Sequence, residues 1–341
     1  MMFLPCGEQL FRSSEPMPTR RMFLASSAAL AVLARIVPAR SQGWPKRPVR
    51  IIFPYTPGSS SYGTASVVAQ RLGHSFGQQF LVESRPGENG VLAAEEVARS
   101  RADGYTILWA TTAPMVIAPA IGRVSYNPVR DFAPVSAITK NTLVLAVHPM
   151  IPATSVAEFL NHLHSRLDKL IYAEAGIGSM SHVAMALFLR LAGMQMNHVS
   201  HKGNAPALMD VVAGHASALL SLLGNAMPHA TNGGLRLLAV AGETRAAAAP
   251  SIPTIAESGF PGFKAVPWNG LIAPAGTPNE IVNILAAHTK YVVRSPKLIE
   301  NLTSYGITLL GNEPEEFAAM ISADLTFWRE GIHAAGLART P

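Results

Sequence analysis

Short runs of β-branched and other apolar residues alternate along the chain with longer stretches in which apolar residues recur every three or four positions. The first run, 49–53, is followed by Val68, Leu72 and Phe76 at four-residue spacing and then by the run 80–83. This alternation is typical of α/β folds in which helices cover largely parallel sheets. Further strands are predicted at 105–110, 143–147, 170–173, 196–199, 218–223, 235–240 and 271–273, and helices at 91–99, 181–191, 206–212, 278–293 and 313–334.

Two helix starts carry a sequence signature. Ser155 with Glu158, and Thr277 with Glu280, have the spacing of a capping box, in which each side chain satisfies a main-chain N–H of the first turn. Pro278 stands at the expected first helical position, where a proline costs no hydrogen bond. We therefore predict helices that begin after Ser155 and after Thr277.

The middle of the chain has a strand and helix series of its own. The apolar strands 143–147 and 271–273 bracket this series. We expect residues 145–271 to form an inserted second lobe, and residues 44–144 together with 272–341 to form the first lobe. Two crossing segments would then join the lobes, and a cleft between two domains is a usual place for a ligand.

Two glycine- and serine-rich loops each follow a predicted strand and precede a predicted helix. The first contains Gly58, Ser59, Ser60 and Ser61, and the second runs from Ala175 to His182. Free N–H groups and the helix dipole favour a carboxylate at such a position, so a dicarboxylate would fit between the two loops. The alternative is that both are tight turns that use glycine for its backbone freedom.

Composition narrows the class of protein. The chain has 341 residues, of which 49% are hydrophobic and 14% charged, with one cysteine. These values exclude a disordered chain, a fibrous repeat and a small disulfide scaffold. The net charge is +6, but the sequence contains no long run of basic residues, so we expect no nucleic-acid partner. Neither His162 with His164 nor His198 with His201 has a supporting carboxylate cluster, so we predict no metal and no cofactor.

The first 39 residues are predicted to be an export signal with an N-terminal extension before Thr19. Thr19-Arg20-Arg21-Met22-Phe23-Leu24 begins a stretch that is uncharged from position 22 to 34, and Val37-Pro38-Ala39 suits a signal peptidase. The arginine pair indicates the twin-arginine route, with an ordinary Sec signal as the alternative. Either signal predicts a periplasmic protein, and cleavage would remove Cys6.

Enzyme interpretations of the second loop are weaker. Gly176-Ile177-Gly178 lacks the third glycine and the later acid of a dinucleotide fingerprint. Ser179 with His182 lacks the second glycine of a nucleophile elbow, and a neighbouring histidine is not the usual partner of a catalytic serine. A periplasmic hydrolase therefore remains only as a minor alternative.

A series of short motifs occurs in order along nearly the whole chain. The motifs are Trp44-Pro45, Pro54-Tyr55-Thr56-Pro57-Gly58, Glu83-Ser84-Arg85-Pro86-Gly87, Asp103-Gly104-Tyr105-Thr106, Asp131-Phe132-Ala133-Pro134-Val135, Gly176-Ile177-Gly178-Ser179, His201-Lys202-Gly203-Asn204-Ala205-Pro206, Pro253-Thr254-Ile255-Ala256-Glu257-Ser258-Gly259 and Ala273-Pro274-Ala275-Gly276-Thr277-Pro278. No single motif is specific, but their joint order is. Together they resemble the Bug (TctC-like) family of periplasmic substrate-binding proteins of tripartite tricarboxylate transporters.

The resemblance implies a two-lobed type II periplasmic binding fold that closes on a small carboxylated solute and presents it to two membrane subunits. It implies no catalysis, and a monomer is the family default. Trp268 would pack at a crossing between the lobes. The ligand contacts that it implies come from Gly58, Ser59, Ser60, Ser61, Thr111, Thr112, Gly176, Gly178, Ser179 and His182.

Departures from the family pattern bear on specificity. Ser59 replaces a glycine, Tyr62 stands where the family has an aspartate, and Ser217 and Ser221 occupy positions where aspartate is frequent. His201 replaces a tyrosine. We hypothesise a less negative cleft, reshaped by Tyr62, that favours an aromatic or bulky carboxylate over a small dicarboxylate. Tyr62 and Ser221 are then also predicted ligand contacts. The alternative is a sensor or an orphan binding protein without transport.

Overall fold

The structure is a computed structural model, and it describes residues 43–122, 124–165, 170–334 and 336–337. The predicted signal at 1–39 and Cys6 lie outside the described residues. None of the helices within these ranges has the length and apolar character needed to cross a bilayer.

The first lobe is built on a six-stranded sheet in the order β11-β4-β10-β3-β1-β2. The strands β1, β2 and β3 run parallel, as the sequence predicts, whereas β10 lies antiparallel between β3 and β4. The sheet is mixed because β10 returns from the second lobe. Its strands are β1 (Val49–Phe53), β2 (Phe80–Ser84), β3 (Thr106–Thr111), β4 (Phe132–Asn141), β10 (Trp268–Pro274) and β11 (Ile307–Leu309).

The second lobe repeats this plan in a five-stranded sheet of order β7-β6-β8-β5-β9. Strand β6 lies between two parallel neighbours, β7 and β8, as β1 lies between β2 and β3, and β5 runs antiparallel to β8. The strands are β5 (Leu143–Val147), β6 (Ile171–Glu174), β7 (Asn197–Ser200), β8 (Ala218–Leu222) and β9 (Arg236–Val240).

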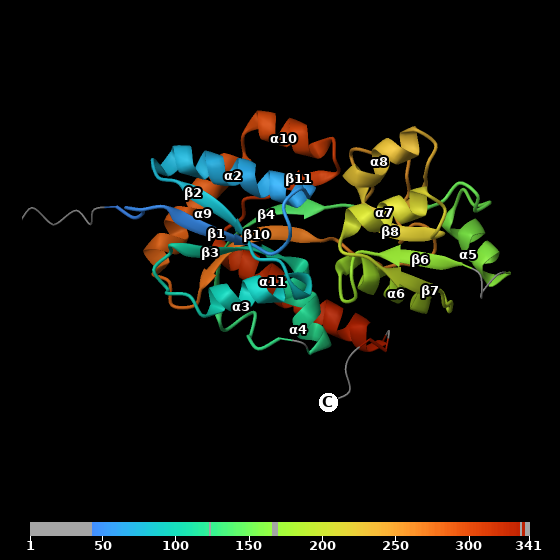
Figure 1. Cartoon of the computed structure of the whole chain (residues 1–341), viewed down its shortest axis with the longest axis horizontal. Coiled ribbons are helices and arrows are strands. Elements are labelled where there is room, and N and C mark those ends of the chain that lie inside the picture. Colours follow the sequence, from blue (N-terminus) through green and yellow to red (C-terminus); the bar gives the residue numbers. More distant parts are fainter. Residues whose placement is uncertain (1–42, 123, 166–169, 335, 338–341) are drawn as a thin grey trace, which may run out of the picture. The chain divides into compact units, whose positions relative to one another are not determined.

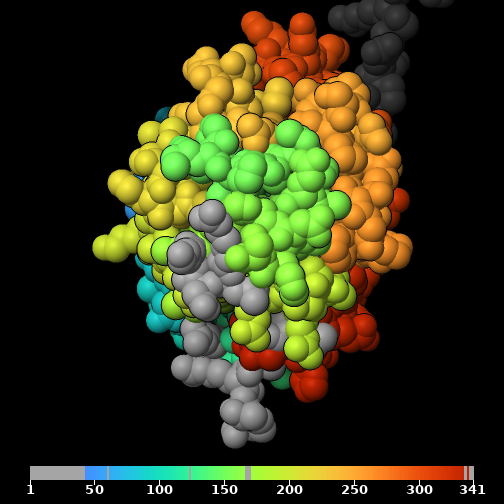
Figure 2. Space-filling model, turned by 90° about the vertical axis from the view of Figure 1, so that its right-hand side faces the viewer, coloured from blue at the N-terminus to red at the C-terminus, as the bar shows by residue number. Residues whose placement is uncertain are grey.

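Helices cover both sheets (Figure 1). The first lobe carries α2 (Ser60–Phe76), the 3-10 turn η1 (Glu88–Gly90), α3 (Val91–Ala98), the π-helical turn η2 (Ala113–Ile117), α4 (Ala118–Ile121), α9 (Asn279–Val293), α10 (Pro296–Thr303) and α11 (Pro314–Ala334). The second lobe carries α5 (Val156–His164), α6 (Met180–Leu191), α7 (Asn204–Val212) and α8 (Leu223–Thr231). Figure 2 shows the second-lobe end, where α5 lies beside the segment that follows β9, and residues of both line a pocket of about 390 Å³.

The predicted elements are present, and the elements that the sequence did not indicate break the usual patterns. The strand β4 contains Pro134 and buried polar residues, which hide its period, and α8 contains Gly224 and Pro228. The expectation of largely parallel sheets was wrong for the predicted strands β5, β9 and β10, which pair antiparallel.

One of the two predicted capping boxes is half formed, and the other is absent. Ser155 Oγ accepts the N–H of Glu158 at 3.2 Å, but the Glu158 carboxylate accepts the N–H of Thr154 at 2.6 Å. The capping box at Thr277 was wrong. Pro278 occupies the N-cap position, its carbonyl accepts the first helical hydrogen bonds, and Thr277 Oγ1 instead donates to Pro274 O at 2.8 Å.

The two lobes are joined by adjacent crossing segments. The N–H of Thr142 donates to Gly306 O of the first lobe, and its carbonyl accepts the N–H of Leu223 of the second lobe, at 3.0 and 2.9 Å. Beside it, the N–H of Asn141 donates to Pro267 O at 2.8 Å. The second crossing ends earlier than expected, because β10 pairs with β4 from Trp268 onward. Residues 268–271 therefore lie in the first sheet rather than in the inserted block.

Trp268 packs at this crossing, as the sequence suggested. Its ring is 1% exposed and meets the Phe317 ring of α11 edge-to-face, with centroids 5.1 Å apart. Gly270, two residues along β10, lies under the same phenylalanine. A Cβ at Gly270 would stand 2.4 Å from the Phe317 ring and 2.8 Å from Ser136 O, so α11 packs closely on β10 only because this position has no side chain.

Candidate functional site

The loops β1–α2 and β6–α6 have the same local structure, and we call residues 57–62 loop one and residues 175–182 loop two. Each has a glycine with positive φ, Gly58 at 101° and Gly178 at 81°, followed by an extended serine at the N-cap. Ser59 Oγ accepts the N–H of Tyr62 at 3.1 Å, and Ser179 Oγ accepts the N–H of His182 at 3.3 Å. Both loops are thus helix N-termini, as the sequence predicts, and the structure shows that each has a serine at the N-cap.

The hydrogen bonds inside loop two decide which of its N–H groups are open to a ligand. The N–H of Gly176 donates to the Glu174 carboxylate, and the N–H of Gly178 donates to His182 Nδ1 at 3.2 Å. These two N–H groups, which the resemblance offers as ligand contacts, are already paired. The first helical N–H groups, those of Met180 and Ser181, have no acceptor within the described part of the chain.

Side chains fix the start of α2 to the first sheet. Ser61 Oγ accepts a hydrogen bond from Trp109 Nε1 and donates to Asn269 Oδ1, both at 3.2 Å. The Asn269 amide in turn donates to Thr139 Oγ1 at 2.7 Å, which links β3, β10 and β4 to loop one. Asn269 was not predicted as a site residue, because a single polar residue within an apolar strand gives no signal in the sequence.

The two threonines at the end of β3 have different surroundings. Thr111 Oγ1 lies 2.9 Å from the hydroxyl of Tyr55, whose pKa is raised by burial and lowered to a smaller extent by this hydrogen bond. Thr112 Oγ1 accepts the N–H of Trp268 at 2.8 Å and is 1% exposed. Thr112 therefore holds β3 to β10, and its hydroxyl is committed to that role.

A group of titratable side chains supports loop two from the second sheet. Glu174, at the end of β6, is 1% exposed, and its Oε1 lies 3.6 Å from His198 Nδ1. The rings of His198 and His182 lie 5.1 Å apart, and His198 also stacks on Tyr172. Burial lowers the pKa of His182, the Glu174 charge raises it, and His198 lowers it. The neutral ring is the form that accepts the N–H of Gly178.

Ser217 and Ser221 each have a hydrogen-bond partner inside the second lobe. Ser221 is fully buried, and its hydroxyl donates to Asn204 Oδ1 at 3.0 Å. Ser217 precedes β8 and bonds the main chain of Ile171, which begins β6, whereas loop two follows the other end of β6. His201 bonds Asp210 at 3.1 Å. Glu174, whose carboxylate accepts the N–H of Gly176, is an acidic side chain in contact with loop two, and no sequence pattern pointed to it.

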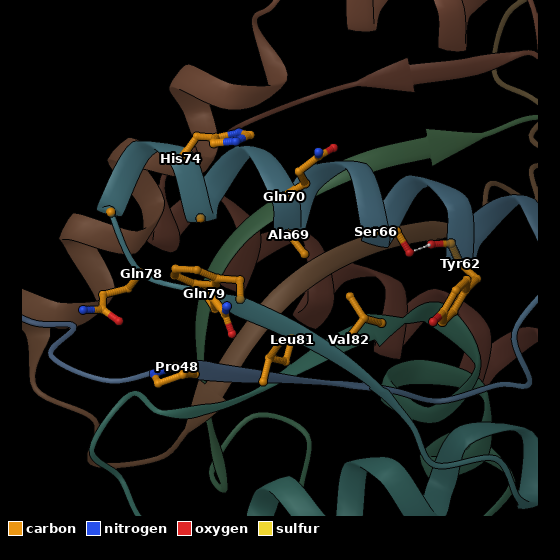
Figure 3. Close-up of a pocket in the computed structure, with 13 residues that line it drawn as sticks. Pro48, Tyr62, Ser66, Ala69, Gln70, His74, Gln78, Gln79, Leu81 and Val82 are labelled. Carbon is orange, nitrogen blue, oxygen red and sulfur yellow. Dashed lines mark hydrogen bonds between the residues drawn. The ribbon is translucent and has the colours of Figure 1, made fainter.

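Tyr62 faces a different cavity. Its ring meets Phe53 edge-to-face at 5.2 Å and lines a pocket of about 840 Å³ between α2 and β2 (Figure 3). We call this cavity the outer pocket. Its other polar residues include Gln70 and His74 of α2 and Gln79, which precedes β2. Of the predicted site residues, Tyr62 alone lines it.

Ser179 serves as a helix cap. Its Oγ accepts the N–H of His182 and lies 3.0 Å from Ser181 Oγ, while His182 Nδ1 bonds Gly178. This arrangement explains both residues without a nucleophile and a base. Within the described ranges, no group of three or more His, Cys, Asp or Glu side chains has the geometry of a metal site.

Two sheets of matching topology, two crossing segments and a helix N-terminus offered from each lobe define the class of two-lobed periplasmic binding proteins. Residues 64–337 match the family described as "Tripartite tricarboxylate transporter family receptor" (TctC), so the chain belongs to this family. The resemblance found in the sequence and the expected fold class are thereby confirmed.

Relatives and solved structures agree with this assignment. Protein BugT of Bordetella pertussis is 29% identical over 93% of this chain and 98% of its own. The structure of "R. palustris Rpa4515 with adipate" is 32% identical, with a TM-score of 0.81 over 87% of this chain and 99% of that one. MatC from Rhodopseudomonas palustris "with bound malate" is 28% identical, with a TM-score of 0.78 over 85% and 100% of the two chains.

Proposed function

We propose that this protein captures a small dicarboxylate between loop one and loop two and presents it to the membrane subunits of a tripartite transporter. The observation that carries the proposal is the matched pair of N-caps at Ser59 and Ser179. Each cap leaves the first N–H groups of a long helix open at the positive end of the helix dipole, which favours a carboxylate. Two such sites suit a ligand with an acid group at each end.

The ligand class also draws on the neighbours. The titles of the two solved relatives name adipate and malate, both dicarboxylates. Our sequence-based hypothesis of an aromatic or bulky acid rested on Tyr62, Ser217 and Ser221. Because Tyr62 lines the outer pocket and Ser217 lies at the far end of the strands, we favour the dicarboxylate.

The site we propose consists of main-chain N–H groups near Gly58, Ser60 and Ser61 in loop one and of Met180 and Ser181 in loop two. Glu174, His182 and Asn269 hold these loops in place without needing to touch the ligand. We propose that the protein is exported through the signal at 1–39, acts in the periplasm as a monomer and has no enzymatic activity. Binding with no turnover is what a receptor requires.

Calorimetry with adipate, malate, succinate and benzoate tests the proposal on the full chain. A ligand at a hundred times its dissociation constant adds about 2.7 kcal/mol of stability, which a thermal-shift screen detects first. We expect one-to-one binding of a dicarboxylate and none of benzoate. Tight benzoate binding would support an aromatic ligand instead. Turnover of any acid would support an enzymatic function instead.

Ser179→Ala and Ser155→Ala form a matched pair of variants. Each removes a serine that caps a helix, and each should cost about 1 kcal/mol of stability. Only Ser179 lies in loop two, so only Ser179→Ala should weaken dicarboxylate binding. Equal dicarboxylate affinities of the two variants would show that loop two is not part of the binding site.

A further inference from the structure

One hydrogen bond joins the first lobe directly to loop two. The side-chain amide of Asn89, in η1 of the first lobe, donates to Ile177 O at 2.6 Å. Ile177 lies between the two positive-φ glycines of loop two, and its side chain is 56% exposed. Because the donor and the acceptor belong to different lobes, this bond breaks when the lobes separate.

The backbone around Asn89 is held in an unusual conformation. Gly87, Glu88, Asn89 and Gly90 all have positive φ, at 146°, 47°, 52° and 94°. Within the described ranges, Glu88 and Asn89 are the non-glycine residues with positive φ. Such a conformation is costly for an L-residue, although less so for asparagine, and tertiary contacts must maintain it.

The packing around loop two fits the Asn89 side chain. A Cβ at Gly176 would stand 3.0 Å from Asn89 Oδ1, and one at Gly178 would stand 3.7 Å from Asn89 Nδ2. A Cβ at Gly178 would also meet the Ile121 side chain of α4 at 3.6 Å. A side chain at Gly176 would therefore crowd the carboxamide, whereas the distances at Gly178 are ordinary van der Waals contacts and its positive φ is what favours glycine there.

We propose that Asn89 is a positioning residue for ligand capture, a latch from the first lobe that holds loop two in the closed arrangement. The bond exists only in that arrangement, so it shifts the equilibrium between open and closed lobes toward closed. By linkage it also slows the release of any ligand enclosed between them. The inference rests on the proposed function in that loop two is the ligand loop, but the closing effect needs no ligand.

The test compares Asn89→Gly with Asn89→Asp. Glycine keeps the positive φ at no cost and removes the carboxamide, so folding should be preserved. Aspartate keeps the size and tolerates the same backbone, but its carboxylate has no N–H to give to Ile177 O and repels it. Asn283→Asp, at an exposed asparagine on α9, controls for the added charge.

The first readout is the distance between spin labels on the two lobes without ligand. The full chain with Cys6→Ser has no other cysteine, so Arg101→Cys and Met209→Cys, both at exposed positions, give one label on each lobe. The ratio of molecules at the closed label distance to molecules at the open distance should fall about five-fold in Asn89→Gly. This fall corresponds to the free energy of one ordinary hydrogen bond. It should fall at least as far in Asn89→Asp and stay unchanged in Asn283→Asp.

The second readout is the dissociation rate of adipate, which should rise about five-fold in Asn89→Gly, while its association rate changes little. Unchanged label distances in both Asn89 variants would overturn the latch. If adipate does not bind the parent protein, the proposed ligand is wrong. The label distances without ligand still test whether Asn89 favours the closed arrangement. If the distances shift but dissociation does not, Asn89 acts on the lobes without positioning loop two, which also overturns the proposal.

Discussion

The indole of Trp268 donates a 2.8 Å hydrogen bond from Nε1 to the carboxylate of Asp324, which joins the start of β10 to α11 beside the crossing between the lobes. The pKa of Asp324 is raised by burial, and the hydrogen bond from Trp268 and the charges of Lys264 and Lys140 only partly oppose this. A carboxyl group whose pKa is higher in the folded state than in the unfolded state lowers the stability as the pH rises through that interval.

Asp324→Asn should therefore make the protein less sensitive to pH. Asparagine can still accept the indole N–H, but it does not titrate. The unfolding free energy of the parent should decrease as the pH rises from the ordinary pKa range of an aspartate toward neutrality. We expect this decrease to be smaller in the variant. Denaturant unfolding at a series of pH values measures this, and a steeper fall in the variant would contradict the assignment.

Loop two should respond to pH in the opposite direction. Since burial lowers the pKa of His182, the unfolded chain takes up a proton more readily than the folded protein as the pH falls below about 6.5. Stability is therefore full above that pH and decreases below it. Protonation at Nδ1 also breaks the hydrogen bond from Gly178.

His182→Asn tests this dependence, because an amide oxygen can accept the same N–H without titrating. We expect the variant to lose less stability than the parent between pH 7 and pH 5. His74→Asn, at a histidine of the outer pocket away from loop two, is the control. An identical pH profile for parent and His182→Asn would show that another group causes the loss.

Gly270→Ala should destabilise the fold. The added methyl group would meet the buried Phe317 ring at 2.4 Å and a main-chain oxygen at 2.8 Å, so α11 and β10 must move apart. Overpacking of this kind costs about 1–3 kcal/mol. Gly63→Ala is the matched control, because a Cβ at this α2 position has nothing within 4 Å and helix propensity favours alanine. Equal changes in thermal stability for Gly270→Ala and Gly63→Ala would refute the close packing of α11 on β10.

The sequence located the two loops at helix N-termini because their signal is local. A glycine and a serine after a strand and before an amphipathic helix define the turn whatever the rest of the fold does, and Ser59 and Ser179 both follow this rule. The lobe plan was predictable for a similar reason, because the helices and parallel strands keep a regular period.

The residues that hold the loops were not predictable from local pattern. Asn269 reaches Ser61 across 208 positions, and Asn89 reaches Ile177 across 88. Glu174 directly follows the strand predicted at 170–173, and only the fold buries it and pairs its carboxylate with the N–H of Gly176. Ser221 is a predicted ligand contact because of the family pattern, and its hydrogen bond to Asn204, 17 positions away, carried no sequence signal. Such contacts depend on which strands become neighbours.

The central claim is that each lobe binds one carboxylate at a serine-capped helix N-terminus. Calorimetric titration of the dicarboxylate that binds most tightly, compared with its monomethyl ester, tests this most directly. Removing one charge should leave one helix N-terminus without its anion and weaken binding by at least about ten-fold, since hydrogen bonds to charged groups contribute about 1.5–3 kcal/mol. Equal affinity for the diacid and the ester would contradict the two-site account.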